Sequence, residues 1–428
     1  MKGLHDNLVQ DPITLFNENT VIPAYPVEGI TTADRIIGAI MGTFIGDALG
    51  QSCLWYYDYN DLWKHYGTWL TDYQDPQQDD PANAMAEIAV YKYQAGVRAG
   101  MNSQTGQLIQ LLLEQVVRDH GFDVEKYAAA VNGFFENEIL PTATFADTVV
   151  DDTVMNTYYG NGIKCFSGRY TNREVRENFD LWYNSGKKDG LWWKDPLVST
   201  TSTSDGAQMA VILAALYRDP KELFERAYQF LRMWYSDPAF ISQALVYALT
   251  VQAVINEVPL ADLKDYMAET LYQMGEIGTR MSSFDDATAS VKMLHIVTKP
   301  QLFNFDDRFA PLLFGANCHI YHLLPCAYYY AYKYCDDFEK SMLVAVNSGG
   351  NNMARATLTG ALTGAMNGIS AIPQRWLQGL TNEKRLIPGD FAGQSGYLMH
   401  LAQAVAQNTQ GEVPLFMGRG GEDCGCFI

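Results

Sequence analysis

Several aspartates in this sequence stand where a carboxylate could act as a general acid or base. Asp205 begins an apolar run of helical period, and Asp80 precedes the first proline of another, so both could also serve only as helix caps. A carboxyl group transfers protons at neutral pH when burial in an aromatic-walled cleft raises its pKa. The candidate acid–base residues are Asp79, Asp80, Asp151 and Asp205.

A second set of residues could bind a substrate. Asn351 and Asn352 provide side chains able to hydrogen-bond at the expected start of a helix. Arg355 lies in the first turn of that helix, where a cation opposes the helix dipole, so we expect it to pair with an acid or an anionic substrate. The substrate-binding candidates are Tyr56, Tyr57, Asp58, Asn351, Asn352 and Arg355.

Three further patterns have both a functional and a structural interpretation. Tyr56 and Tyr57 could stack on a ring of a ligand, whereas aromatic clusters in helical proteins more often lie in the core. His319 and His322 have the spacing of paired metal ligands, but no nearby acid or cysteine pattern completes a site. The seven cysteines are scattered and do not predict a disulfide framework.

The elements that position these residues are expected to be helices. Apolar residues recur at helical spacing, and the alternation typical of strands is scarce. Residues 138–205 lack clear periodicity, which is typical of a functional surface or an insert. The predicted helices cover 33–50, 81–99, 105–118, 125–137, 206–217, 221–234, 238–256, 260–279, 320–333, 336–347, 352–368 and 394–407.

Two of these helices carry a small residue at every fourth position. This step places the small residues on one helical face, where another backbone can approach closely. Each glycine costs about 1 kcal/mol of helix propensity relative to alanine, so we expect both glycine ladders to be packing surfaces. The ladders are Gly38, Gly42, Gly46 and Gly50 in the first helix, and Ala356, Gly360, Gly364 and Gly368 in the second.

Composition limits the class of protein. Of 428 residues, 48% are hydrophobic and 13% aromatic, enough for a large buried core. The net charge of −19 disfavours binding to nucleic acid or to anionic membranes, since both require a basic face. No signal-peptide core is apparent, so we expect a cytoplasmic protein. We also expect an N-terminal arm at 1–30, one helical domain at 31–407 and a glycine-rich tail at 408–428.

Four motifs, in order along the chain, resemble those of the ADP-ribosylglycohydrolase family. The second of them is similar to a signature of the crystallin-J-like branch of that family. The resemblance implies an all-α fold, in which many helices form a compact orthogonal bundle around a central cleft. The motifs are GAIMGTFIGDALG at 38–50, SCLWYYD at 52–58, SDGAQMAVILAAL at 204–216 and GGNNMARATLTGALTGAMNG at 349–368.

The resemblance also implies a chemistry, in which two magnesium ions help to cleave the glycosidic bond between ADP-ribose and the group it is attached to. The stretch that matches the first metal motif keeps Asp79 and Asp80 but lacks both threonines of the family. Asn351 and Met353 stand where the last motif has carboxylates, and Leu54 stands where the family has a glutamate. Losing three carboxylates would weaken magnesium binding by roughly 6 kcal/mol. We therefore expect no metal cofactor, with one magnesium ion on Asp79 and Asp80 as the alternative.

Three functions follow from these observations. We favour a divergent hydrolase of this family that keeps a polar central cleft, has lost the dinuclear magnesium site and uses aspartates as acid and base. Its substrate would be a small molecule or a group derived from a peptide or protein. The alternatives are a non-catalytic binding or structural, crystallin-like protein and an orthodox magnesium-dependent ADP-ribosyl hydrolase.

Overall fold

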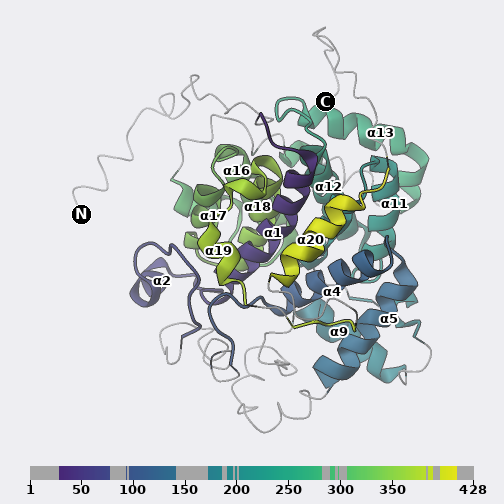
Figure 1. Ribbon diagram of the computed structural model, residues 1–428, viewed down its shortest axis with the longest axis horizontal. Coiled ribbons are helices and arrows are strands. Elements are labelled where there is room, and N and C mark those ends of the chain that lie inside the picture. The colour runs from purple at the N-terminus through teal and green to yellow at the C-terminus, as the bar shows by residue number, and fades with distance from the viewer. Residues whose placement is uncertain are drawn as a thin grey trace.

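The secondary structure of the protein is helical, as Figure 1 shows. The β-pairing found among the described residues is limited to isolated bridges, so the predicted all-α class is confirmed. The computed structural model describes residues 28–77, 93, 96–140, 172–185, 190–195, 198–199, 202–281, 290–294, 297, 306–381, 384–388 and 396–411.

Two antiparallel helices, α1 (Thr32–Gln51) and α18 (Asn352–Asn367), lie side by side at the centre of the fold (Figure 1). A Cβ atom on Gly42 would lie 2.7 Å from the carbonyl carbon of Gly360 and closer still to its oxygen. Only glycine permits backbones to approach this closely, so both glycine ladders are packing surfaces, as predicted. The other contacts pair Gly38 with Gly364, Gly46 with Ala356 and Gly50 with Met353.

A buried arginine joins the N-terminal end of α1 to the C-terminal end of α18. Arg35 is fully buried, and its guanidinium donates hydrogen bonds to the carbonyl oxygens of Ala365 (3.1 Å) and Met366 (2.7 Å) in the last turn of α18. It also forms an ion pair of 3.1 Å with Glu257. A cation at this position satisfies carbonyls that have no partner within the helix and complements the negative end of its dipole.

Further helices surround the central pair. Next to it lie α4 (Gln104–Arg118), α10 (Asp205–Leu216), α12 (Pro238–Ile255), α16 (Ile320–Lys333), α17 (Phe338–Asn347) and α20 (Tyr397–Gln407). Among the described residues, α12 is the one helix long and apolar enough to cross a membrane; 83% of it is buried inside the protein, as in a core helix. The remaining elements are α2 (Tyr59–Tyr66), α5 (Val124–Phe134), η2 (Phe135–Ile139), α9 (Arg173–Asn184), η3 (Trp192–Lys194), α11 (Pro220–Leu231), α13 (Leu263–Met281), η5 (Asp307–Phe309), α15 (Ala310–Phe314), η6 (Ile369–Ala371) and α19 (Gln374–Gly379).

The helix α9 corrects a prediction, because it lies inside the stretch 138–205 that lacks clear periodicity. Its buried face includes Val175, Phe179 and Trp182, which follow the helical spacing of four and three residues. Charged and polar residues between them lower the average apolarity of the segment, so the stripe is short and easily overlooked. The predicted helix at 81–99 falls almost entirely outside the described residues.

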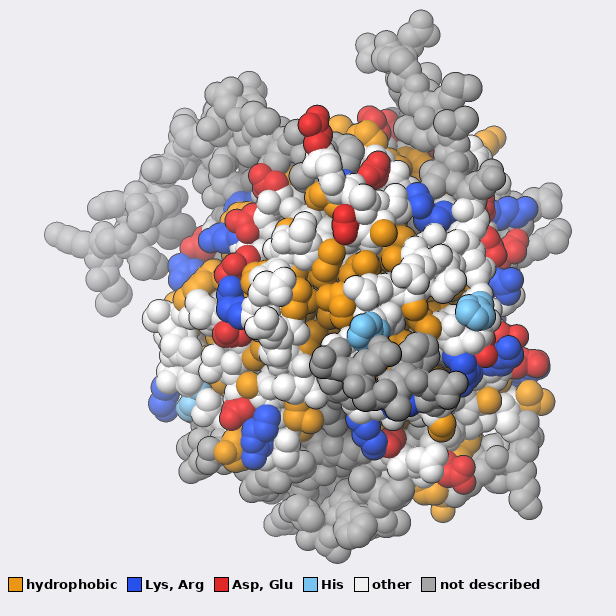
Figure 2. All heavy atoms as spheres, viewed as in Figure 1, with side chains coloured by type: hydrophobic (Ala, Val, Ile, Leu, Met, Phe, Trp, Pro, Cys, Tyr) orange, Lys and Arg blue, Asp and Glu red, His pale blue; other side chains and the backbone are white. Residues whose placement is uncertain are grey.

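Charged side chains are spread across the face of the molecule drawn in Figure 2. Acidic and basic groups alternate around its margin, and hydrophobic side chains show across its centre, where Figure 1 places α1 and α20. The described residues of this face form no continuous basic patch, in keeping with the net charge of −19.

We expect the substitution Gly42→Ala to lower the free energy of unfolding by about 3 kcal/mol or to prevent folding, because the added methyl group would overlap the backbone of Gly360. Gly133 of α5 is the matched control, since a Cβ atom there meets nothing within 4 Å. Gly133→Ala should raise stability by up to about 1 kcal/mol through helix propensity. Chemical denaturation of both variants measures the contrast, and equal effects would contradict the close backbone contact.

Candidate functional site

Five helices are linked through their N-terminal ends. Side chains join α4, α9 and α10 directly, and a β-bridge between Thr203 and His319 joins the start of α10 to the start of α16. The amide of Asn351, which precedes α18, donates to the carbonyl oxygen of Ala316 at 2.7 Å, just before α16. Helix N-termini carry partial positive charge and unpaired amide groups, so this end of the bundle favours anions.

An acidic pair lies among these N-terminal ends. Asp205 is 6% exposed, and its carboxylate accepts hydrogen bonds from the Thr105 hydroxyl (2.5 Å) and the Asn172 side-chain amide. Glu174 is fully buried and accepts from the Thr203 hydroxyl at 2.6 Å. A hydrogen bond connects the two carboxyl groups, so residues from α4, α9 and α10 meet in one cluster.

The environment of the pair favours a shared proton. Burial raises the pKa of Glu174 well above its ordinary value of 4.5, and the charge of Asp205 and the hydrogen bond between them raise it further. Glu174 therefore holds its proton to higher pH than an exposed glutamate does, and the protonated group can donate to Asp205. Two carboxyl groups that share one proton form an arrangement suited to acid–base chemistry.

Tyr235 packs against the first turn of α10 and forms a hydrogen bond with it. Its hydroxyl accepts from the amide of Gly206 at 2.6 Å and donates to the carbonyl oxygen of Thr203 at 3.1 Å. A Cβ atom on Gly206 would overlap the tyrosine ring, so glycine is required for this contact. Burial raises the pKa of Tyr235, and the charges of Glu174 and Asp205 add to this effect, so the hydroxyl stays protonated beside the pair.

Cys318 also lies within electrostatic range of the pair. Desolvation by the surrounding atoms raises the pKa of its thiol to about 11, and the charges of Asp205 and Glu174 contribute to the shift, although the residue is exposed. A thiol with this pKa is protonated at neutral pH and is therefore a poor nucleophile.

A strained loop follows the first glycine ladder and pairs with the loop before the second. The amide of Trp55 donates to the carbonyl oxygen of Gly350 (2.9 Å), and the amide of Gly350 donates to that of Tyr56 (2.7 Å). Gly349 and Gly350 have φ of 59° and 63°, which glycine adopts readily. Trp55 has φ of 71°, which is costly for a bulky residue and is tolerated only where the surroundings hold it.

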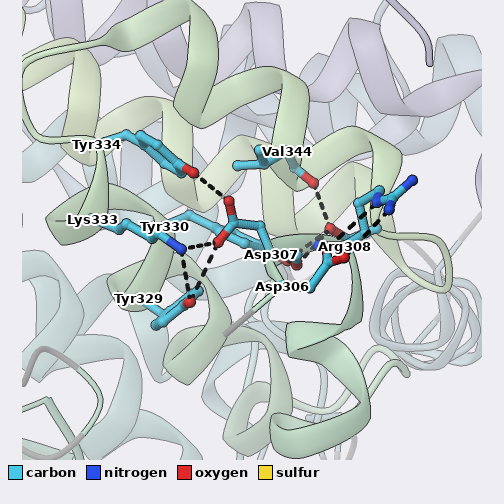
Figure 3. Close-up of polar contacts among 9 residues, drawn as sticks. Asp306, Asp307, Arg308, Tyr329, Tyr330, Lys333, Tyr334 and Val344 are labelled. Atoms are coloured by element: carbon cyan, nitrogen blue, oxygen red, sulfur yellow. Dashed lines mark hydrogen bonds and ion pairs between the residues drawn. The ribbon is translucent and has the colours of Figure 1, made fainter. Parts of the chain in front are cut away.

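Figure 3 shows the polar network around Asp307, which connects α16 to the loop before α18. The carboxylate of Asp307 accepts from Lys333 (2.5 Å), from Tyr329 (3.3 Å) and from the hydroxyl of Tyr334. Its carbonyl oxygen accepts from the Tyr330 hydroxyl at 2.6 Å, which is also hydrogen-bonded to Ser348 at 2.7 Å. Ser348 directly precedes the two glycines, so the network fixes their position.

Comparison with known proteins identifies the family. The model of the ADP-ribosylglycohydrolase family matches residues 28–412. The chain belongs to the ADP-ribosylglycohydrolase family. An uncharacterised protein of Archaeoglobus fulgidus is 27% identical over 187 residues, which are 43% of this chain and 56% of that protein, so the similarity spans little more than half of that relative.

A solved structure confirms the fold of the family. A chain described as an ADP-ribosylglycohydrolase-related protein complex matches with a TM-score of 0.53 at 16% identity, covering 89% of this chain and 99% of that one. At this identity the likeness shows the fold alone, and it agrees with the predicted helical bundle of the ADP-ribosylglycohydrolase type. The crystallin-J-like branch stays a prediction.

The structure places Asn351 and Asn352 in local hydrogen bonds. Asn351 is the N-cap of α18, where its side chain accepts from the amide of Ala354 at 3.3 Å. Asn352 is fully buried, and its side-chain amide donates to the carbonyl oxygen of Val346 (2.9 Å) and to the sulfur of Cys53 (3.0 Å). Asn351 thus caps α18, whereas the donor group of Asn352 is directed into the core.

Arg355 has partners other than the acid or anionic substrate expected for it. Its side chain is fully buried, and Nη1 donates to the carbonyl oxygens of Ala345 (3.1 Å) and Gly349 (2.9 Å). These carbonyls lie at the C-terminal end of α17, where a cation complements the helix dipole. Arg355 therefore stabilises the turn between α17 and α18. Arg35 has a similar role at the C-terminal end of α18.

The three residues after Trp55 also divide into different environments. Tyr56 is buried, and its ring packs against those of His65 and Tyr66, with centroids 5.9 and 5.5 Å apart. Asp58 is the N-cap of α2 and accepts from the amide two residues later at 2.8 Å. Tyr57 is 50% exposed and Asp58 is exposed as well, so both can meet a ligand from solvent.

Among the predicted acid–base residues, the structure places Asp205 in a polar cluster, whereas Asp79, Asp80 and Asp151 lie outside the described residues. Its partners Thr105, Asn172, Glu174 and Thr203 were not predicted. A signal for Glu174 existed, since it shares the buried face of α9 with Val175 and Phe179. Thr105 offered none, because its role depends on contacts with two other helices.

The described residues do not fit the family's magnesium pair. Within them, no three His, Cys, Asp or Glu side chains are grouped closely enough to hold a metal ion. The side-chain oxygen of Asn351 already caps α18, and Met353 has no oxygen ligand to offer a hard cation. His319 and His322 use Nδ1 in local hydrogen bonds, His319 accepting from the Tyr321 amide at 3.3 Å and His322 bonding to the Asn317 side chain at 2.6 Å.

The raised pKa of Glu174 predicts a pH-dependent stability. The folded protein holds this proton more tightly than the unfolded chain, so Glu174 favours folding at pH below 4.5 and loses that contribution as pH rises towards its folded pKa. Glu174→Gln removes the titration while keeping both hydrogen bonds. Relative to the native protein, we expect the variant to gain up to about 1.4 kcal/mol of stability per pH unit above pH 4.5.

Denaturation at several pH values between 5 and 8 measures this difference. Glu177→Gln on the same helix is the control, because Glu177 is partly exposed and forms an ion pair with Arg173 at 2.6 Å. Its difference from the native protein should change far less with pH. A flat profile for Glu174→Gln would show that Glu174 is ionised in the folded state.

Proposed function

We propose that this protein is a divergent hydrolase of the ADP-ribosylglycohydrolase family, in which Asp205 and Glu174 serve as the acid–base centre. The observation that supports the proposal is the buried carboxyl pair, held by side chains of α4, α9 and α10 among linked helix N-terminal ends. The substrate that we propose is a riboside, free or attached to a peptide or protein, with an anionic group.

The chemistry needs one proton donor and one negative charge close to the scissile bond. Cleavage of a glycosidic bond proceeds through a cation-like sugar, which a carboxylate stabilises while a carboxylic acid protonates the leaving group. Asp205, which is 6% exposed, would face the substrate and pass the proton it shares with Glu174 to the leaving group. Water would then add to the cation-like sugar, and its proton would return to the carboxyl pair. The partial positive charge of the helix N-termini would hold an anionic group of the substrate.

We propose further that this reaction proceeds without the family's two magnesium ions. Asn351 and Met353 provide no carboxylate at the start of α18, and the donor group of Asn352 points to the core. A neutral oxygen binds magnesium more weakly than a carboxylate does. Binding of a single ion by Asp79 and Asp80 would, like binding of the pair, make the rate sensitive to EDTA in the experiment below.

One observation favours a non-catalytic role as the second candidate. Glu174 is fully buried and Asp205 is only 6% exposed, so the pair reaches solvent over a small area. Buried carboxyl pairs of this kind also occur as structural networks that specify the packing of helix ends. In that case the protein would bind a ligand or have a structural role without cleaving a substrate, as its crystallin-like resemblance implies.

We expect Asp205→Asn to lower the rate of hydrolysis at least about 100-fold, because it removes the carboxylate and keeps the shape of the side chain. The assay is release of ADP-ribose from O-linked and N-linked ADP-ribosyl compounds, with magnesium or with EDTA. Asp237→Asn is the matched control, since Asp237 caps α12 by accepting from Ala239 at 2.8 Å. It should leave the rate nearly unchanged.

The outcomes separate the three functions. A rate that is insensitive to EDTA and lost in Asp205→Asn supports the metal-independent hydrolase. A rate that EDTA abolishes and magnesium restores would support the orthodox enzyme and contradict the loss of the metal site. Absence of hydrolysis in the native protein, combined with saturable binding of ADP-ribose, would support the non-catalytic role.

A further inference from the structure

A cavity lies apart from the acidic pair. It has a volume of about 570 Å³, which is in the range that holds a small ligand. None of the described residues that line it belongs to the pair or its hydrogen-bonding partners. Its principal lining residues are Tyr66, Tyr73, Gln74, Asp75, Gln77 and Tyr93.

Three hydrogen-bond donors that line this cavity already have acceptors within the protein. The hydroxyl of Tyr66 donates to the carbonyl oxygen of Ser52 at 2.8 Å, and that of Tyr73 donates to the carbonyl oxygen of Trp376 at 2.9 Å. The side-chain amide of Gln77 donates to the Tyr66 hydroxyl. These three groups are therefore engaged with the protein and do not point to a ligand that accepts hydrogen bonds.

Acceptors remain in the cavity. One carboxylate oxygen of Asp75 accepts from the amide of Ala99 at 2.8 Å, and the described part of the chain provides no partner for its other oxygen. Gln77 donates through its nitrogen, which leaves its carbonyl oxygen as an acceptor. Asp75 is exposed, so its charge is reachable from solvent. The cavity therefore suits a ligand rich in donors.

The aromatic rings favour the same kind of ligand. The face of a tyrosine ring is electron-rich and attracts a cation. Tyr93 already receives one, because the guanidinium of Arg98 lies 3.9 Å from its ring centroid. Apart from Arg98, which packs on Tyr93, the described residues at this cavity include no lysine or arginine, and the net charge of −19 raises the local concentration of cations around the protein.

We propose that this cavity binds a primary alkylammonium group. The ammonium would donate to Asp75 and to the amide oxygen of Gln77, while its alkyl chain would pack on the tyrosine rings. The group could come from a free amine or from a lysine side chain, since the chemistry is the same. This site is independent of the proposed hydrolase activity.

Calorimetric titration of the full chain with n-butylammonium chloride tests the proposal, with n-butanol as the uncharged analogue. We expect saturable binding of the ammonium and none of the alcohol. Asp75→Asn should weaken binding at least about fivefold, because it removes the charge and keeps an oxygen for the Ala99 amide. Asp72→Asn should change it less than about twofold, since Asp72 lies on the same segment outside the described lining.

Three results would overturn the proposal. They are no saturable binding of the ammonium, equal binding of the alcohol, and equal losses in the two variants, which would indicate only long-range attraction. A second titration with the amide of Nα-acetyl-lysine distinguishes the sources: tighter binding than n-butylammonium supports a lysine side chain, and weaker binding supports a free amine. Unchanged thermal midpoints of both variants show that the fold is retained.

Discussion

The contact between the backbones of α1 and α18 is the constraint on which the rest of the structure depends. The backbones at Gly42 and Gly360 are in direct contact, with no side chain between them. This contact fixes the C-terminal end of α1 relative to the N-terminal end of α18. The loop after α1 and the loop before α18 therefore meet, and Tyr56 pairs with Gly350. The other helix starts are joined to this end of the bundle, so the position of the acidic pair follows from the helix packing.

Electrostatics then explains why two carboxyl groups can be buried together. Removing a carboxylate from water costs several kcal/mol, and two ionised carboxylates side by side would repel. Glu174 reduces this cost by holding its proton, and the hydroxyl of Thr105 and the amide of Asn172 both donate to Oδ1 of Asp205. The partial positive charge of the surrounding helix starts lowers the cost further. The result is a small, polar centre inside an otherwise apolar bundle.

The sequence predicted what depends on spacing within one element. The glycine ladders gave the central helix pair, and helical periodicity gave most of the other helices, because both patterns are local. The chemistry of Arg355 and Asn352 could not be predicted in the same way, since a polar residue in a first turn can face either a cleft or the carbonyls of a neighbouring helix. Glu174 was missed because its partners, Thr203 and Asp205, lie on another element. Its place on the buried face of α9 follows the helical period, but that period does not identify the groups that Glu174 meets.

The central claim is that Glu174 holds its proton beside Asp205 to a pH well above that at which an exposed glutamate loses it. A ¹³C NMR titration of protein labelled at the glutamate carboxyl carbons measures it most directly, with Glu174→Gln to assign the signal. The structure predicts a glutamate signal, absent from the variant, that titrates well above 4.5. A Glu174 signal that titrates near 4.5 would contradict the shared proton and, with it, the proposed acid–base centre.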